Sequence, residues 1–204
     1  MQKAVYIFGS GGHTRSLISL LKQCDFKILG IFDNTFNTQE KELINNIELI
    51  GNFKDFKLDK RIILSIGDNV KRRELFNVYS ESLFMPNVFH PTSFVEDTVV
   101  LGKANFVFAN VALNSNVKIG DNNIINTGAI IEHEVEIGSH NHVSVGSIIC
   151  GRSKIGSNCF IGAGSVINDK VEVCDNVTIG SNSTVINSIL EPGTYVGQPI
   201  RKVN

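Results

Sequence analysis

Hydrophobic positions recur with a period of six residues along the C-terminal half of the chain. A hexapeptide period is typical of a parallel β-helix, in which each six-residue step supplies one short strand and one corner. Three steps make one coil, so residues 101–190 predict five coils whose periodic residue points into the core. Every sixth residue in this run is Leu, Ile or Val: Leu101, Val107, Leu113, Ile119, Ile125, Ile131, Ile137, Val143, Ile149, Ile155, Ile161, Ile167, Val173, Ile179 and Val185.

Glycines accompany the same period. One glycine per coil follows the inward residue, at Gly102, Gly120, Gly138 and Gly156. We expect these glycines to supply corner backbone angles that residues with a Cβ reach only at a cost.

The first 85 residues follow a different pattern. Short apolar strands are expected over residues 5–8, 28–32 and 62–66, with helical stretches after residue 13 and over residues 70–80. Buried strands that alternate with helices predict a small parallel α/β sheet. Pro86 and Pro91 mark the expected joint. The chain is therefore predicted to hold a Rossmann-like domain over residues 1–85 and a β-helix domain over residues 86–204.

A glycine-rich loop joins the first strand to the first helix. Backbone N–H groups and the helix dipole at such a loop favour a phosphate. A dinucleotide is not expected, because Thr14 stands at the third glycine position and only one βαβ half precedes the β-helix. The alternative is a tight turn without a ligand. Ligand residues are expected at the carboxyl ends of the strands: Gly9, Ser10, Gly11, Gly12, His13, Asp33, Asn34 and Gly67.

Composition narrows the classes of function. The net charge of −1, from 19 basic and 20 acidic residues, does not favour a nucleic-acid partner. No apolar run approaches a membrane span, and the N-terminus does not look like a signal peptide, so a cytoplasmic location is expected. The cysteines show no CxxC spacing and predict reduced thiols: Cys24, Cys150, Cys159 and Cys174.

Three histidines, His133, His140 and His142, fall within ten residues of the β-helix. These histidines could be solvated side chains or metal ligands. However, Glu134 lies next to His133, and its carboxylate could raise the basicity of the His133 imidazole. One coil above His133 stands Gly151. We expect this glycine to leave open space for a thioester, with its N–H facing the thioester oxygen. A general base is therefore favoured over a metal site.

The residues around this histidine carry a family resemblance. The segments Asn126–Glu134 and His142–Gly146 resemble bacterial nucleotide-sugar acyltransferases that join a left-handed hexapeptide β-helix to a small Rossmann-like domain. The best-known members N-acetylate nucleotide-linked 4-amino-4,6-dideoxy sugars for glycan or O-antigen assembly, and other relatives O-acetylate sialic acid. The resemblance implies acetyl-CoA as co-substrate, no bound metal and a homotrimer.

The resemblance also implies residue roles. His133 is the expected general base and Glu134 its partner. The nucleotide sugar is expected at the N-terminal residues given above and at Asn126. The expected acetyl-CoA contacts are His142, Gly151, Ala163 and Ser181.

Departures from the family pattern affect the nucleotide end. Asn34 stands where a second acidic residue is common, Thr14-Arg15 where a small residue and Lys are common, and Ile200 where Ala is common. The nucleotide base, sugar epimer and acyl length therefore stay open. The main alternative function is O-acetylation of sialic acid or another sugar. A zinc enzyme of the β-helix carbonic-anhydrase type and a non-catalytic assembly protein are the remaining alternatives.

Overall fold

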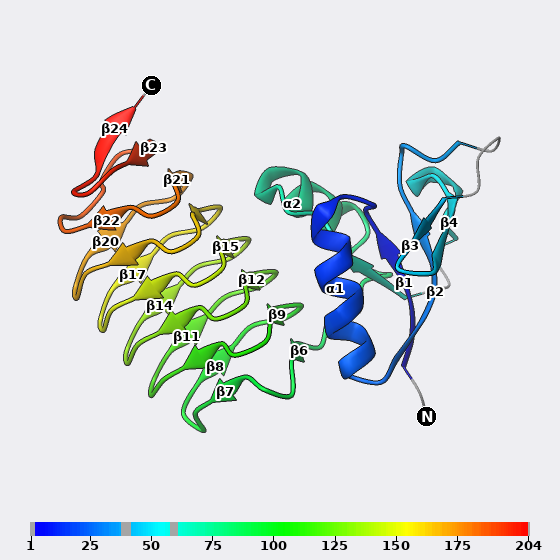
Figure 1. The fold of residues 1–204 in the computed structure, drawn as a ribbon, viewed down its shortest axis with the longest axis horizontal. Helices are drawn as coiled ribbons and strands as arrows, with labels where there is room; N and C mark the ends of the chain where they lie inside the picture. The colour runs from blue at the N-terminus through cyan, green and yellow to red at the C-terminus, as the bar shows by residue number, and fades with distance from the viewer. Residues whose placement is uncertain (1–2, 38–41, 58–60, 204) are drawn as a thin grey trace. The chain divides into compact units, whose positions relative to one another are not determined.

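The computed structural model describes residues 3–37, 42–57 and 61–203, and the chain folds into two compact units, residues 1–85 and 86–204 (Figure 1). Within the described residues, no helix combines the length and the apolar character needed to cross a membrane.

The first unit is an α/β fold around a five-stranded sheet of order β3-β4-β2-β1-β5. Strands β1, β2, β4 and β5 run parallel, and β3 is antiparallel to β4. The predicted alternation of strands and helices is confirmed. The elements are β1 (Lys3–Phe8), α1 (Gly12–Gln23), β2 (Phe26–Phe32), β3 (Leu43–Ile44), β4 (Ile47–Gly51), the 3-10 helix η1 (Phe53–Asp55), β5 (Ile62–Leu64) and α2 (Asn69–Val78).

Two apolar groups form the core of this unit. Helix α1 buries one side completely, through Leu17, Ile18, Leu20 and Leu21. An aromatic cluster surrounds the end of β1, where Phe8 stacks on Phe53 with ring centroids 4.8 Å apart. These groups hold β1 rigidly, and β1 leads directly into the glycine loop.

The hairpin β3–β4 was not predicted from the sequence. Its turn residues, Asn45 and Asn46, both have positive φ, at 50° and 66°. Asn tolerates this region better than other residues with a Cβ, and two such residues in succession favour a tight hairpin. The Asn-Asn pair between apolar residues was therefore the signal in the sequence.

The second unit is a left-handed parallel β-helix with three flat faces. The first face contains β6 (Val88–Phe89), β9 (Phe106–Val107), β12 (Ile124–Ile125), β15 (His142–Val143), β18 (Phe160–Ile161), β21 (Val177–Ile179), β23 (Gly193–Val196) and the antiparallel β24 (Arg201–Val203). The second face contains β7 (Phe94–Val95), β10 (Ala112–Leu113), β13 (Ile130–Ile131), β16 (Ile148–Ile149), β19 (Val166–Ile167) and β22 (Thr184–Val185). The third face contains β8 (Val100–Leu101), β11 (Lys118–Ile119), β14 (Glu136–Ile137), β17 (Lys154–Ile155) and β20 (Glu172–Val173).

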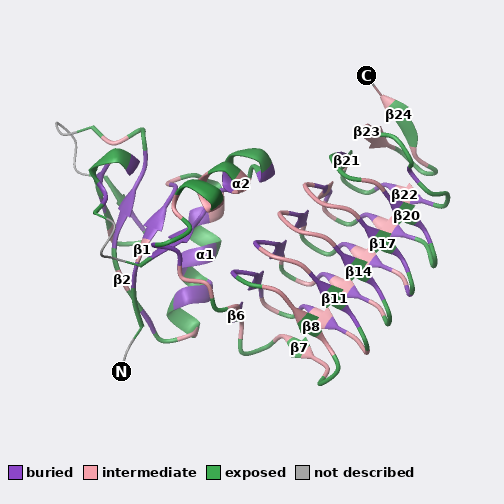
Figure 2. Cartoon of the chain, turned by 180° about the vertical axis from the view of Figure 1, so that it is seen from behind, coloured by how far each residue is buried: buried purple, intermediate pink, exposed green. Residues whose placement is uncertain are grey.

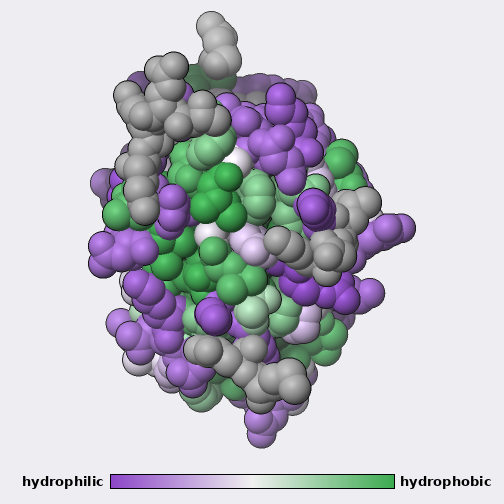
Figure 3. All heavy atoms as spheres, turned by 90° about the vertical axis from the view of Figure 1, so that its right-hand side faces the viewer, coloured by the Kyte–Doolittle hydropathy of each residue, from purple (hydrophilic) through white to green (hydrophobic). Residues whose placement is uncertain are grey.

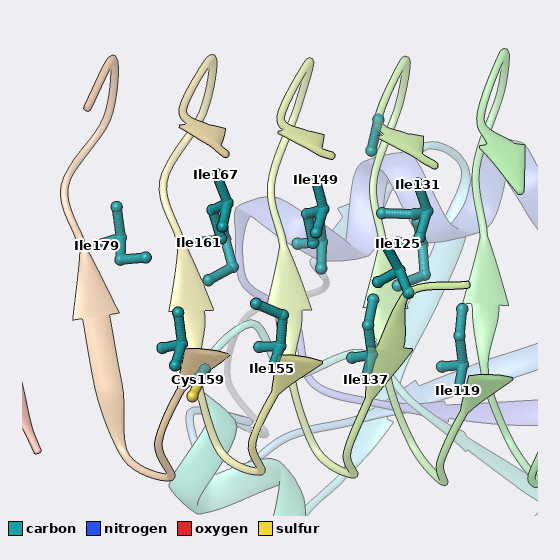
Figure 4. Packing of buried hydrophobic residues seen from close by; sticks show 14 of the residues in the cluster. Ile119, Ile125, Ile131, Ile137, Ile149, Ile155, Cys159, Ile161, Ile167 and Ile179 are labelled. Carbon is teal, nitrogen blue, oxygen red and sulfur yellow. The ribbon is translucent and has the colours of Figure 1, made fainter. Parts of the chain in front are cut away.

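The periodic residues point into the core of the β-helix, as predicted, and stack on their equivalents one coil away (Figure 4). Figure 2 shows the same alternation, with buried strand positions between exposed corners. The β-helix also begins before the predicted run of periodic residues, because β6 and β7 form strands before Leu101. The periodic position there is held by Phe89 and Val95, which are less buried at the open end of the stack.

The expected role of the corner glycines was wrong. Positive φ falls on the third residue of most corners, for example 62° at His140 and 60° at Glu134. Gly120 and its equivalents lack positive φ and serve a steric need instead. A Cβ on Gly120 would lie 2.9 Å from the carbonyl oxygen of Gly138 in the next coil. These glycines let consecutive coils pack at the spacing of β-strands.

Candidate active site

The corner after β13 pairs a histidine with a carboxylate. His133 and Glu134 are half exposed, and the imidazole Nδ1 lies 3.1 Å from the Glu134 Oε2. Glu134 has φ of 60°, a conformation that the coils directly before and after it also adopt at this corner, so the fold places its side chain next to that of His133. A carboxylate on Nδ1 leaves Nε2 as the nitrogen that can take a proton from a substrate. The pair is a suitable general base.

Gly151 lies directly against the imidazole. A Cβ on Gly151 would be 2.6 Å from both Cε1 and Nε2 of His133, so any other residue at this position would displace the ring. The open space expected above His133 is therefore filled by the ring itself, because the side chain of His133 extends along the stack toward the next coil. Among the described residues, no acceptor pairs with the Gly151 N–H.

An ion pair that the sequence did not reveal lies above this histidine. The guanidinium of Arg152 donates to both oxygens of Asp169, with its Nη2 at 3.0 Å from each. The backbone N–H of Arg152 donates to the carbonyl oxygen of His133 at 2.9 Å. Arg152 and Asp169 are 17 residues apart, which is close to the length of one coil. This spacing is the one sign of the ion pair in the sequence.

His142 lies elsewhere on the β-helix. It begins β15 on the first face, is buried, and packs edge-on against Phe160 with ring centroids 5.2 Å apart. Its Nε2 lies 3.2 Å from the amide nitrogen of Asn126. The first face is opposite the corner that carries His133, so one chain does not bring His133 and His142 together. It does bring His142 and Asn126 together.

The third histidine of the sequence cluster, His140, belongs to another corner. Its Nδ1 lies 2.9 Å from the amide nitrogen of Asn122, one coil below. The three histidines therefore stand at three separate places on the prism. In the part of the chain that the structure describes, no group of three or more His, Cys, Asp or Glu side chains is arranged to hold a metal ion.

Ala163 and Ser181 share the corner between the first and second faces, one coil apart. Their corner has open glycines with positive φ, at Gly128, Gly146 and Gly164, where a Cβ would meet nothing within 4 Å. Val145, on the same edge, is 48% exposed although apolar. This edge presents backbone and small side chains, which suits an extended ligand lying along the stack.

Contacts with the end of β5 and with Thr14 fix the glycine loop of the first unit. Gly9 has φ of 112°, and a Cβ there would lie 2.6 Å from the carbonyl oxygen of Ser65 at the end of β5. Thr14, fully buried, donates its hydroxyl to the Gly9 carbonyl at 2.8 Å. Thr14 thus fixes the loop where a dinucleotide fold would have its third glycine. Gly11 and Gly12 are exposed, with open space above them.

Asp33 supports this loop through hydrogen bonds within the protein. Its carboxylate accepts from the Ser10 N–H at 2.8 Å and from the N–H and hydroxyl of Thr35 at 2.9 and 3.0 Å. Burial raises the pKa of Asp33, but the hydrogen bonds from Thr35 and Ser10 outweigh that effect and hold the pKa below its ordinary value. Asp33 therefore stays ionised and ties the end of β2 to the loop. Its neighbour Asn34 lines a separate cavity of about 510 Å³ with Asn52 and Tyr79.

A buried arginine fixes the loop after β5. Arg72 is fully buried and donates to the carbonyl oxygens of Ile66 and Gly67, at 3.0 and 3.3 Å, and to the Asn69 side chain at 2.8 Å. Burial lowers the pKa of Arg72 to about 9, opposed by Asp68, so the guanidinium is still charged at neutral pH. Gly67 faces His13, whose Cβ is 4.0 Å from the site of an added Cβ. The predicted residues of these two loops therefore lie together.

Comparison with known protein families finds two matches. Residues 4–79 match the PglD N-terminal domain, and residues 152–187 match the bacterial transferase hexapeptide repeats. The structure also matches a histidine-to-asparagine variant of perosamine N-acetyltransferase from Caulobacter crescentus, crystallised with CoA and GDP-perosamine. That match has 26% identity and a TM-score of 0.90, and covers 98% of this chain and 97% of the other.

Over nearly its whole length, the chain is similar to hexapeptide-repeat sugar N-acyltransferases.

Two further structures extend the likeness of this acyltransferase. The acetyltransferase domain of PglB from Neisseria gonorrhoeae, in complex with acetyl coenzyme A, shares 21% identity over 100% of both chains, with a TM-score of 0.90. The N-acyltransferase AntD from Bacillus cereus, in complex with dTDP and 3-hydroxybutyryl-CoA, shares 19% identity over 57% of this chain and 78% of the other, with a TM-score of 0.54. Comparison with curated proteins finds no match.

Proposed function

We propose that this protein transfers an acetyl group from acetyl-CoA to the amine of a nucleotide-linked amino sugar, with His133 as the general base. The observation that carries the proposal is the His133–Glu134 pair packed against Gly151, whose N–H has no acceptor among the described residues. The perosamine N-acetyltransferase that matches the whole chain, crystallised with CoA and GDP-perosamine, supports the same substrate class.

The reaction follows from these groups. The Nε2 of His133 removes a proton from the sugar ammonium or from the attacking amine, and the nitrogen lone pair forms a bond to the thioester carbon. The Gly151 N–H stabilises the negative oxygen of the tetrahedral intermediate. The C–S bond then breaks, and the CoA thiolate leaves and takes up a proton. A positioned base contributes about 10²–10⁴-fold to such a rate, and much of the rest comes from holding the two substrates together.

The first unit binds the nucleotide in this proposal. The N-terminus of α1 has no side-chain cap, and Gly11 and Gly12 expose their backbone with open space around it. Backbone N–H groups and the helix dipole then face the diphosphate of the sugar nucleotide. Asp33 and Arg72 hydrogen-bond to the loops that follow β1 and β5, so their role is to position the backbone that binds the phosphates.

A homotrimer completes the site in this proposal. The outward residues of the second face are apolar and partly exposed: Phe94, Ala112, Ile130, Ile148 and Val166. The outward residues of the third face are mostly charged: Val100, Lys118, Glu136, Lys154 and Glu172. Both faces belong to the same repeat, so the difference favours burial of the second face against other copies of the chain.

This packing would also unite the expected CoA residues. The second face is bounded on one side by the corner of His133 and on the other by the corner of Asn126, Ala163 and Ser181. Around a threefold axis, the first corner of one subunit meets the second corner of its neighbour. CoA would then lie between subunits, with His133 from one copy and Ala163 from the next.

A direct assay tests the activity. The protein is incubated with acetyl-CoA and, separately, with UDP-, dTDP- and GDP-linked 4-amino sugars and with free sialic acid, and products are identified by mass spectrometry. An acetyl group should appear on at least one nucleotide sugar. Acetylation of sialic acid together with no reaction on any nucleotide sugar would replace this proposal by O-acetylation.

The shared site has its own test. His133→Asn and Ala163→Trp should each inactivate the enzyme, but from different corners. Mixed trimers of the two inactive variants would contain some interfaces with an intact His133 facing an intact Ala163, so activity should return on mixing. Ile148→Lys should give monomers in sedimentation experiments. No recovery on mixing, from variants that each form trimers, would place the site within one subunit.

A further inference from the structure

The environment of the His133–Glu134 pair contains a second pair of opposite charges with no role in the mechanism above. Arg152 stands directly above Glu134 in the stack, since the two residues occupy the same corner position in consecutive coils and both have φ of 60°. Both side chains line one cavity of about 420 Å³. The nearest cation in the stack is therefore placed to pair with the carboxylate that supports the base.

Arg152 nevertheless pairs with a different carboxylate. Its guanidinium makes a two-pronged contact with Asp169, through hydrogen bonds of 3.0, 3.0 and 3.3 Å. Such contacts are stronger and more directional than a single ion pair. In the described part of the chain, His133 is the one hydrogen-bond partner of the Glu134 side chain. Among the described residues, Arg152 thus bonds to Asp169 and not to Glu134.

We propose that Asp169 is a positioning residue for the base: by retaining Arg152, it keeps the Glu134 carboxylate available to His133. The inference rests on the proposed function for its consequence in catalysis, but the contacts themselves do not. Without Asp169, the guanidinium would be free to turn to Glu134, which lies one coil below it at the same corner and lines the same cavity. A neutralised Glu134 would stabilise the imidazolium of His133 less, so His133 would lose its proton at lower pH.

Other ionisable groups near His133 do not take over this role. Cys150 remains a neutral thiol, because burial first, and then Glu132 and Asp169, raise its pKa. Lys170 lies 3.9 Å from Asp169, beyond the hydrogen-bonded pair. The charges of the third face that line the same cavity already pair along the stack, Lys118 with Glu136 at 2.9 Å and Lys154 with Glu172 at 3.3 Å.

The test is a titration of the His133 ring by NMR in protein labelled at its histidines, with the His133 signal assigned by its loss in His133→Asn. Asp169→Asn should lower the midpoint of the titration by about 0.5 pH unit, the size expected for a half-exposed ion pair. The double variant Asp169→Asn with Arg152→Gln should return the midpoint to the wild-type value, because no guanidinium is left to reach Glu134.

A matched control separates this effect from a general change in charge. Lys170→Gln removes a neighbouring cation but leaves the Arg152–Asp169 contact in place, so the midpoint should stay as in the wild type. An unchanged midpoint in Asp169→Asn, or a lowered midpoint that persists in the double variant, would overturn the proposal.

The catalytic consequence is measured in parallel. The acid limb of the rate profile should move with the NMR midpoint in Asp169→Asn and return in the double variant. Full activity in His133→Asn would instead show that His133 is not the base. That result would sink the proposed function and leave the titration result intact, so the two failures are distinguishable.

Discussion

Gly151→Ala is the most direct test of the geometry around the base. The added methyl carbon would lie 2.6 Å from Cε1 and Nε2 of His133, whereas ordinary contacts begin near 3.4 Å, so the ring must move by about 0.8 Å. The ring is half exposed and can swing toward solvent. Gly151 lacks positive φ, so the backbone accepts alanine without strain.

The magnitude follows from this displacement. Misplacing a catalytic group by about 1 Å can cost about 10²-fold in rate, which corresponds to about 2.7 kcal/mol of transition-state stabilisation. The free energy of unfolding should change by less than about 1 kcal/mol, because the substitution opens no cavity and removes no hydrogen bond. We therefore expect kcat/KM to fall about 100-fold while the denaturation midpoint stays near that of the wild type.

The assay is a double-mutant cycle. Rates of acetyl transfer and denaturant midpoints are compared for the wild type, Gly151→Ala, His133→Ala and the double variant. In the His133→Ala background the methyl group meets no ring, so it should cost little further, and the coupling energy should approach the full effect of Gly151→Ala. A Gly151→Ala enzyme with near-normal kcat/KM, or effects that simply add, would show that the ring of His133 does not act from this position.

Three further predictions follow from the same structure. His133→Asn should keep the fold and CoA binding but lower kcat by about 10²-fold or more; a folded variant with wild-type rates would remove His133 from the mechanism. Gly11→Asp should abolish binding of the sugar nucleotide in calorimetry through repulsion of the diphosphate, while CoA binding persists; unchanged nucleotide affinity would make the loop a structural turn. Asp33→Ala should destabilise the first unit at neutral pH. The folded pKa of Asp33 lies below its unfolded value, so the stabilisation by its carboxylate is complete above about pH 4 and is lost as the pH falls through the folded pKa. The unfolding free energies of the variant and the wild type should therefore converge in acid. A difference that persists in acid would refute an electrostatic role.

The sequence alone determined the β-helix. A period that fills one inward position per strand leaves a single way to bury every Leu, Ile and Val of the run, so the register needed no tertiary information. The parallel order of the first strands was likewise readable, because strands buried on both faces are uniformly apolar. The hairpin β3–β4 was missed because strands this short carry no periodic signal, and only its Asn45-Asn46 turn marks it.

Only the tertiary structure decided what the polar side chains contact. The sequence indicated that His133 and Gly151 are neighbours, since they are one coil apart, but not that the ring fills the space above the glycine. It placed His133, His140 and His142 in one cluster. In the structure, His133 and His140 lie at two different corners of the prism, and His142 lies on the first face. It offered Asp33 as a ligand for the nucleotide but did not indicate that the Asp33 carboxylate accepts a hydrogen bond from the loop. The hydrophobic pattern is set by burial of one residue in six, but a polar partner is chosen by side-chain direction across coils, which the period does not encode.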